Sequence, residues 1–71
     1  MIITYDDTAD ALYIQFQRAA KVKQTLRIRD GIMVDIGKNG KIFGIEVLDA
    51  SRKVPIAELG KLSINLPVHA A

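Results

Sequence analysis

The chain contains no cysteine, no tryptophan and only two prolines among its 71 residues. Without cysteine, disulfide bonds and cysteine metal sites are excluded, and the composition fits a reducing compartment. No apolar run approaches the roughly 20 residues needed to cross a membrane. The first residues, MIITYDD, lack the basic and apolar segments of a signal peptide. We therefore expect a cytoplasmic protein that does not enter a membrane.

Length and charge limit the function classes further. Seventy-one residues predict one domain spanning 1–71. Ten basic and eight acidic residues leave a net charge of +2, which is too small to argue for a nucleic-acid partner. Half of the residues are hydrophobic, a composition typical of a folded core. A chain this short is marginally stable without association, which favours a homodimer.

The strongest local signal is Asn39-Gly40, which predicts a type I′ turn in a β-hairpin spanning 31–51. A four-residue loop, 38–41, gives the same register. The predicted apolar face pairs Ile36 with Phe43, Val34 with Ile45 and Ile32 with Val47. The opposite face pairs Asp35 with Gly44 and Met33 with Glu46. Because side chains alternate along a strand, a slip of one residue would bury the polar row.

Two further strands precede this hairpin. Alternation predicts strands over 1–5 and 10–17, paired so that Ile3 and Tyr5 lie beside Leu12 and Ile14. The loop between them is four to six residues long. Residues 18–21 form a connection to the next predicted strand.

A clean alternation predicts that strand over 22–29. A three-residue loop with Gly31 in the left-handed conformation would pair Ile28 with Ile32 and Leu26 with Val34. The inner face of the resulting three-stranded meander is then apolar. It carries Leu26, Ile28, Ile32, Val34, Ile36, Phe43, Ile45 and Val47.

The last twenty residues carry two weaker patterns. Pro55 and Gly60 bound a segment typical of one or two helical turns, and a start nearer Asp49 is the alternative. Apolar residues then alternate over 62–68, a strand pattern that Pro67 confines to a sheet edge or a chain end. Segment 61–68 could pair within the chain, swap between copies or be free. The predicted fold class is therefore α+β and β-rich: a hairpin plus a three-stranded antiparallel meander, about five strands, with a short C-terminal helix and, as an option, a C-terminal edge strand.

Several sequence blocks resemble the DUF2283 family of small prokaryotic proteins of unknown function. The blocks are ITYD at 3–6, ADALYI at 9–14, Asp30-Gly31, the strand of Asp35, and GKIFGIEVLDAS at 40–51. The resemblance covers 2–51 and leaves 52–71 as a variable extension. The chain has Gly-Lys-Asn at 37–39, where the family usually carries acidic residues, so this turn is basic. The resemblance implies no established activity, and it suggests an antitoxin-like role with a small toxin-like partner.

Three carboxylates are the candidate ligand-binding residues: Asp35, Glu46 and Asp49. A hydrolytic pair would need one desolvated carboxyl group. Ion pairing of Arg27 with Asp35 or Glu46 on a solvated face is the competing interpretation. The acidic turn of Asp6, Asp7 and Asp10 lacks the glycine and distal glutamate of a calcium loop, so we expect an Asx-turn and no metal. No motif indicates a cofactor or a catalytic residue.

Basic residues follow one another from position 18 to position 29 without an intervening acid. The candidate nucleic-acid contacts are Lys21, Lys23, Arg27 and Arg29, joined by Arg18. A charge run on a strand is more often its solvated face. The second face of the sheet is expected to expose apolar residues, namely Tyr13, Met33, Ile42 and Leu48. Such a surface favours a non-enzymatic, self-associating interaction module. A carboxylate-based binding protein or enzyme and a weak nucleic-acid binder are the alternatives.

Overall fold

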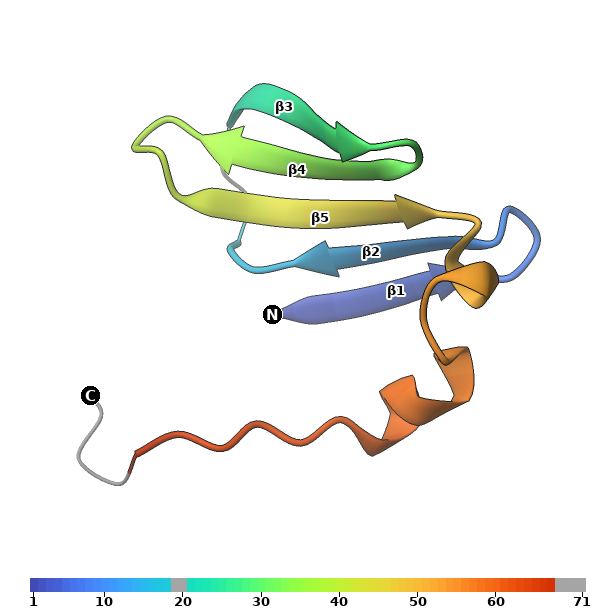
Figure 1. Ribbon diagram of the computed structural model, residues 1–71. Helices are drawn as coiled ribbons and strands as arrows, with labels where there is room; N and C mark the ends of the chain where they lie inside the picture. The colour runs from blue at the N-terminus through green and yellow to red at the C-terminus, as the bar shows by residue number, and fades with distance from the viewer. Residues whose placement is uncertain (19–20, 68–71) are drawn as a thin grey trace.

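The computed structural model describes residues 1–18 and 21–67 and contains one five-stranded antiparallel sheet (Figure 1). The strands are β1 (Ile2–Asp6), β2 (Ala11–Gln15), β3 (Val22–Arg29), β4 (Ile32–Gly37) and β5 (Ile42–Leu48). Their order in the sheet is β1-β2-β5-β4-β3. The predicted hairpin and meander are confirmed, and they join through pairing of β2 with β5. Among the described residues, no helix is long and apolar enough to cross a bilayer.

The central register matches the prediction over four pairs, from Ile32 opposite Val47 to Asp35 opposite Gly44. The predicted type I′ turn is wrong, because Gly40 has a positive φ of 79° whereas Asn39 does not. Gly40 N–H donates to the Gly37 carbonyl and Gly37 N–H to the Lys41 carbonyl, which closes a three-residue loop. This loop shifts the pairing by one residue, so Ile36 lies opposite Ile42 rather than Phe43. A bulge at Phe43 then restores the predicted register.

The register predicted for the β1–β2 hairpin is confirmed, and the register predicted for the β3–β4 hairpin is confirmed only in part. Ile3 pairs with Ile14 and Tyr5 with Leu12, as predicted. Gly31 has the predicted positive φ, 75°, and Leu26 pairs with Val34. The predicted pairing of Ile28 with Ile32 is wrong, because Arg29 takes that place and the register shifts between Arg27 and Arg29. Ile28 is therefore exposed instead of lying on the apolar face.

A small core lies where two short 3₁₀ helices cover one end of the sheet. They are η1 (Ala50–Arg52) and η2 (Ile56–Lys61), and η2 occupies the segment predicted as a helix after Pro55. The buried apolar side chains are Leu12 (2% exposed), Val47 (9%) and Ala50 (0%). Half-buried side chains from the sheet and from η2 pack around them: Ile3, Tyr5, Ile32, Ile45, Val54, Ile56 and Leu59.

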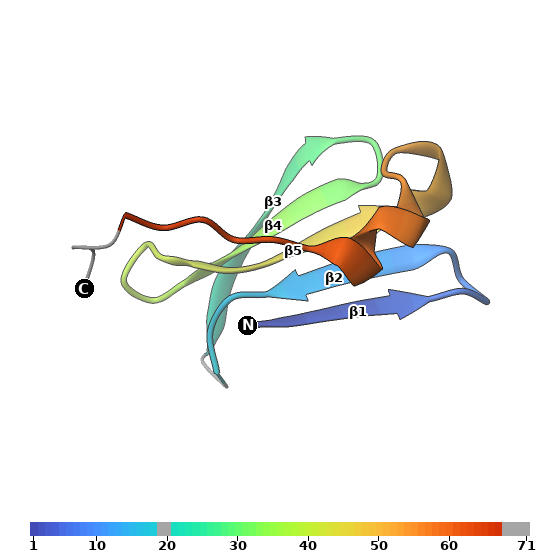
Figure 2. The same ribbon diagram turned by 90° about the horizontal axis from the view of Figure 1, so that it is seen from below.

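Of the alternatives for the C-terminal segment, an edge strand within the chain is not formed in the part that the structure describes. Residues 62–67 form no strand, and Val68 lies outside the described residues. The segment leaves η2 and runs back along the strand direction, as both views show (Figures 1 and 2). Leu62, Ile64 and Leu66 are 56%, 59% and 74% exposed. The segment with these alternating side chains therefore pairs with no strand among the described residues.

Two parallel rows of apolar side chains cross the inner face of the sheet. The first row, from Tyr5 through Leu12 and Val47 to Ile32, carries the buried core. The second row lies two residues further from η1 along the strands and contains Ile3, Ile14, Ile45, Val34 and Leu26. No member of the second row is buried, and Leu26 is 40% exposed. The 3₁₀ helices thus cover one row and leave the other partly open.

Candidate functional site

Asp35 lies at the centre of a hydrogen-bonded row on the outer face of the sheet. Tyr13 Oη of β2 donates to Asp35 Oδ2 at 2.8 Å, and Thr25 Oγ1 of β3 donates to Asp35 Oδ1 at 2.6 Å. Both oxygens of the carboxylate are therefore engaged. The row ties β2, β4 and β3 together across three strand pairings.

The row depends on the glycine at position 44 of β5, because the Tyr13 ring crosses β5 at that position. A Cβ atom on Gly44 would lie 2.2 Å from Tyr13 Oη and 2.9 Å from the Ile14 carbonyl oxygen. Since real Cβ atoms do not approach so closely, only glycine leaves room for this ring. Burial raises the pKa of Tyr13 to about 12, with smaller contributions from the Asp35 hydrogen bond and the charges of Asp35 and Glu46.

Glu46 lies on the same outer face, opposite Tyr13 of β2 and Met33 of β4. The sequence suggested an ion pair of Arg27 with Asp35 or Glu46. In the structure Arg27 instead forms an ion pair of 2.5 Å with Asp30. Asp49, the third candidate, follows β5 and occupies the N-cap of η1 with φ 51°. The structure thus brings Asp35 and Glu46 to one face and leaves Asp49 beyond its end.

Asp10 forms a junction that the sequence analysis missed. Its Oδ1 accepts hydrogen bonds from Tyr5 Oη at 2.7 Å and from Ser51 N–H at 2.9 Å, and its Oδ2 accepts one from Ser51 Oγ at 2.7 Å. Ala50 N–H donates to the Asp10 carbonyl at 3.0 Å. These bonds, from Tyr5 first and then Ser51, hold the pKa of Asp10 below its usual value. The junction joins the β1–β2 turn to the segment after β5.

The acidic turn behaves as an Asx-turn, as expected. Asp6 Oδ1 accepts hydrogen bonds from Thr8 N–H at 3.0 Å and Ala9 N–H at 3.1 Å. Within residues 1–18 and 21–67, no three histidine or acidic side chains are grouped to hold a metal ion. Asp6 and Asp10 of this turn therefore serve different local contacts.

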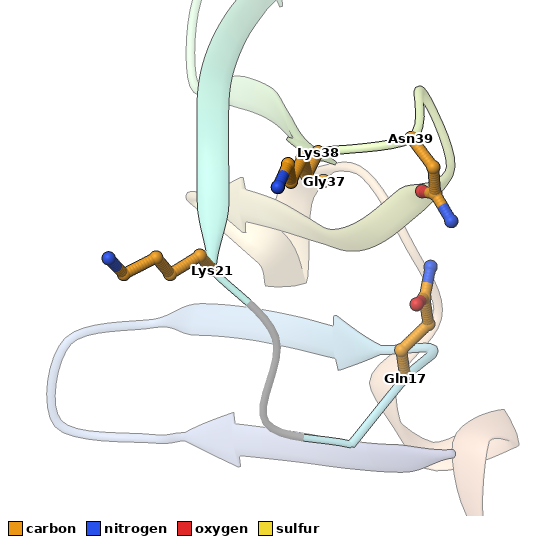
Figure 3. A pocket seen from close by; sticks show the side chains of 5 residues that line it. All are labelled: Gln17, Lys21, Gly37, Lys38 and Asn39. Carbon is orange, nitrogen blue, oxygen red and sulfur yellow. The ribbon is translucent and has the colours of Figure 1, made fainter.

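The four predicted basic residues divide between two ends of the sheet. Arg27 and Arg29 lie near the β3–β4 turn, where Arg29 lines a hollow with Asp30 and Lys53. Lys21 and Lys23 lie at the opposite end, beside the β4–β5 turn. Lys21 lines a cavity there (Figure 3). The whole of β3 is exposed.

Comparison with known proteins supports the blocks identified in the sequence. A model of the family described as "Protein of unknown function (DUF2283)" matches residues 2–51. An uncharacterised protein of Methanocaldococcus jannaschii is 42% identical over 50 residues, which are 70% of this chain and 41% of that protein. The chain therefore spans less than half the length of this curated relative. No solved structure matches the chain.

Proposed function

The chain belongs to the DUF2283 family of proteins of unknown function, and we propose that it is a non-enzymatic interaction module that works as a homodimer. The observation that carries the proposal is the open second row of the inner face. A second copy placed over this row would supply the cover that η1 and η2 give to the first row. An isologous contact between identical faces is the commonest way in which small proteins associate.

The exposed area supports this proposal. The chain exposes 5814 Å², whereas a folded monomer of 7.8 kDa is expected to expose about 4,400 Å². A standard protein interface buries about 800 Å² on each partner. The excess surface of one chain is therefore large enough to supply one side of such an interface.

Exposed apolar side chains are numerous in the described chain, and Leu26 is the one that belongs to the second row. Eleven large apolar residues among those described are exposed, on the strands, next to them and in the segment after η2. They are Met1, Ile2, Phe16, Val22, Leu26, Ile28, Ile42, Leu48, Leu62, Ile64 and Leu66. Tyr13 and Met33, which the sequence analysis placed in the same group, are only half-exposed.

The proposal is non-enzymatic because the best carboxylate candidate is already engaged. Asp35 accepts one hydrogen bond on each oxygen, from Tyr13 and from Thr25, which fixes the carboxylate within a row that ties three strands together. We place the protein in the cytoplasm of a prokaryote, in keeping with its lack of cysteine. The partner suggested by the family resemblance is a small toxin-like protein, which would bind the dimer.

A pair of matched variants tests the proposed interface. Leu26→Glu puts a charge on the second row, whereas Ile2→Glu puts the same charge on the outer face of the other edge strand. Both side chains are exposed, 40% and 59% respectively. Sedimentation equilibrium at micromolar concentrations should give a monomer for Leu26→Glu and a dimer for Ile2→Glu. A dimer that survives Leu26→Glu would remove this face from the interface.

A further inference from the structure

The C-terminal segment 62–67, the tail, differs from the rest of the chain in its lack of charge. Residues 62–71 form the longest run of the sequence without aspartate, glutamate, lysine or arginine. Leu62 begins the tail with extended backbone angles, φ −55° and ψ 131°. Apolar residues occupy positions 62, 64 and 66, and Ser63 and Asn65 lie between them. An extended segment with this alternation has one apolar side and one polar side.

The apolar side of the tail is mostly uncovered within its own chain. Leu62, Ile64 and Leu66 keep 56%, 59% and 74% of their surface exposed. The preceding helix η2, by contrast, packs Ile56 and Leu59 against the buried core. Figure 1 shows the tail apart from the five strands. The chain therefore covers its first row with η2 and leaves the apolar side of its tail in solvent.

The open second row of the inner face matches the tail in length. The row runs across all five strands of the sheet, from Ile3 of β1 to Leu26 of β3. Because neighbouring strands lie about 4.8 Å apart, the row is about 19 Å long. The tail, with an extended backbone, spans about 20 Å. A tail laid along the row would reach from one edge of the sheet to the other and cross the strands at nearly a right angle, as strands do in orthogonal packing.

The row and the tail also match in chemistry. No side chain of the row carries a charge or a polar group, because its members are Ile3, Ile14, Ile45, Val34 and Leu26. None of these five residues is buried in the single chain. A charged occupant would lose its hydration against such a row without gaining a partner. The uncharged apolar side of the tail avoids this cost.

The free edge of β3 is a less suitable place for the tail. β3 is the last strand of the sheet, and all of its residues are exposed. Its pairing with β4 shifts between Val22 and Gln24 and again between Arg27 and Arg29. Such irregularities, together with basic side chains, are the features by which edge strands resist the addition of a further strand. The inner face is therefore the better position for the tail.

We propose that the tail of one copy lies along the second row of the other copy, so that two chains exchange their tails. This inference rests on the proposed homodimer and names the segment through which it forms. Each chain has one tail and one second row, so a twofold arrangement fills both rows, and the assembly closes at two chains. In the dimer, the tail supplies to the partner's second row the cover that η2 supplies to the first row.

Two full-length variants that place the same charge on opposite sides of the tail test this exchange. Ile64→Glu puts the charge on the apolar side, whereas Asn65→Glu puts it on the polar side. In sedimentation equilibrium, Ile64→Glu should raise the dissociation constant of the dimer at least about tenfold, because the burial of one apolar side chain is lost. Asn65→Glu should stay within about twofold of the unmodified chain. Circular dichroism of each variant reports whether the sheet is intact.

The absence of cysteine allows a direct test of the contact. Ile64 is central on the apolar side of the tail and Ile45 is central in the row, so they lie close whichever way the tail runs. Val34 pairs with Ile45 and accepts cysteine with little change of volume. Val34→Cys is mixed with Ile64→Cys and treated with a short bismaleimide. Each chain then carries a single thiol, so a 34–64 cross-link joins two copies.

Met33→Cys is the matched control for the cross-link. Met33 precedes Val34 on β4 but lies on the outer face, opposite Glu46. We expect mass spectrometry to find the 34–64 cross-link and no 33–64 cross-link.

The outcomes separate the exchange from the homodimer itself. An unmodified chain that is monomeric at micromolar concentrations removes both. A dimer whose dissociation constant is unchanged in Ile64→Glu keeps the homodimer and rejects the exchange. Equal weakening by Asn65→Glu, or a cross-link to position 33 rather than 34, also rejects it. Cross-linking within one chain of the double variant Val34→Cys/Ile64→Cys, without cross-linked dimers, would assign the row to the chain's own tail.

Discussion

Asp10 and Ser51 are separated by 41 positions in the chain, yet the carboxylate of Asp10 accepts two hydrogen bonds from Ser51. The bonds fix the entry to β2 against the segment that follows β5. Asp10 itself has a positive φ of 50°, so the turn places its carboxylate toward η1. Both residues belong to the region matched by the family model. The family blocks around them thus have a structural explanation.

Removal of the Ser51 hydroxyl should loosen this junction. We expect Ser51→Ala to lower the free energy of unfolding by about 1 kcal/mol, the net value of one hydrogen bond. For a domain of this size, that change lowers the melting temperature by about 4–8 °C. Thermal unfolding followed by circular dichroism measures it. Ser63→Ala, in the tail outside the sheet, is the matched control and should leave the melting temperature unchanged.

The hydrogen bonds of Asp10 also predict that stability decreases at low pH. The pKa of Asp10 is lower in the folded chain than the ordinary value of 3.8 for an aspartate. Its contribution to stability is therefore fully present above that value and is lost as the pH falls through the lower folded pKa. Unfolding by urea at a series of pH values should show stability decreasing below pH 3.8. The decrease should be smaller in Asp10→Asn, and an equal decrease in both proteins would contradict the assignment.

The raised pKa of Tyr13 predicts that stability decreases at high pH. Its folded pKa of about 12 lies above the ordinary value of 10.0 for a tyrosine. The stability that it contributes is therefore complete below pH 10 and is lost as the pH rises through about 12. Titration by tyrosinate absorbance should place Tyr13 near 12, and Asp35→Asn should move its pKa toward 10. The titration is done in the Tyr5→Phe background, because the chain has two tyrosines and Tyr13 is then the remaining source of the absorbance change.

Gly44 should tolerate no larger side chain. In Gly44→Ala the new Cβ would lie 2.2 Å from Tyr13 Oη and 2.9 Å from a backbone oxygen that cannot move freely. We expect a loss of about 1–3 kcal/mol, typical of overpacking. Gly60→Ala is the control, because no atom lies within 4 Å of its Cβ position. Chemical denaturation of the two variants should separate them, and equal stabilities would show that Tyr13 can leave Gly44 without cost.

Local alternation was enough to predict the strands, since β3 spans Val22–Arg29 as the pattern indicates. The central register was also predictable, because a one-residue slip would bury Asp35 and expose Val34. The turn type was not predictable. The three-residue loop after Gly37 shifts the pairing by one residue, and the bulge at Phe43 shifts it back. Both leave the register at Asp35 and Gly44 intact. Side-chain alternation therefore cannot distinguish this hairpin from one with a tight turn.

Long-range contacts were beyond the reach of sequence patterns. The outer-face position of Asp35 and Glu46 followed from the register, but the partners of Asp35 lie on β2 and β3. Arg27 was expected to pair across strands, whereas Asp30 is nearer in the following turn. The strand pattern after Leu62 predicted a sheet edge, but a strand requires a partner, and none lies beside 62–67 in the described chain.

The mass of the chain in solution tests the proposed dimer. Sedimentation equilibrium of the unmodified chain at micromolar concentrations should give a mass of twice 7.8 kDa. It should fall to the monomer mass in Leu26→Glu and stay at the dimer mass in Ile2→Glu. An unmodified chain that sediments as a monomer throughout this range would contradict the account.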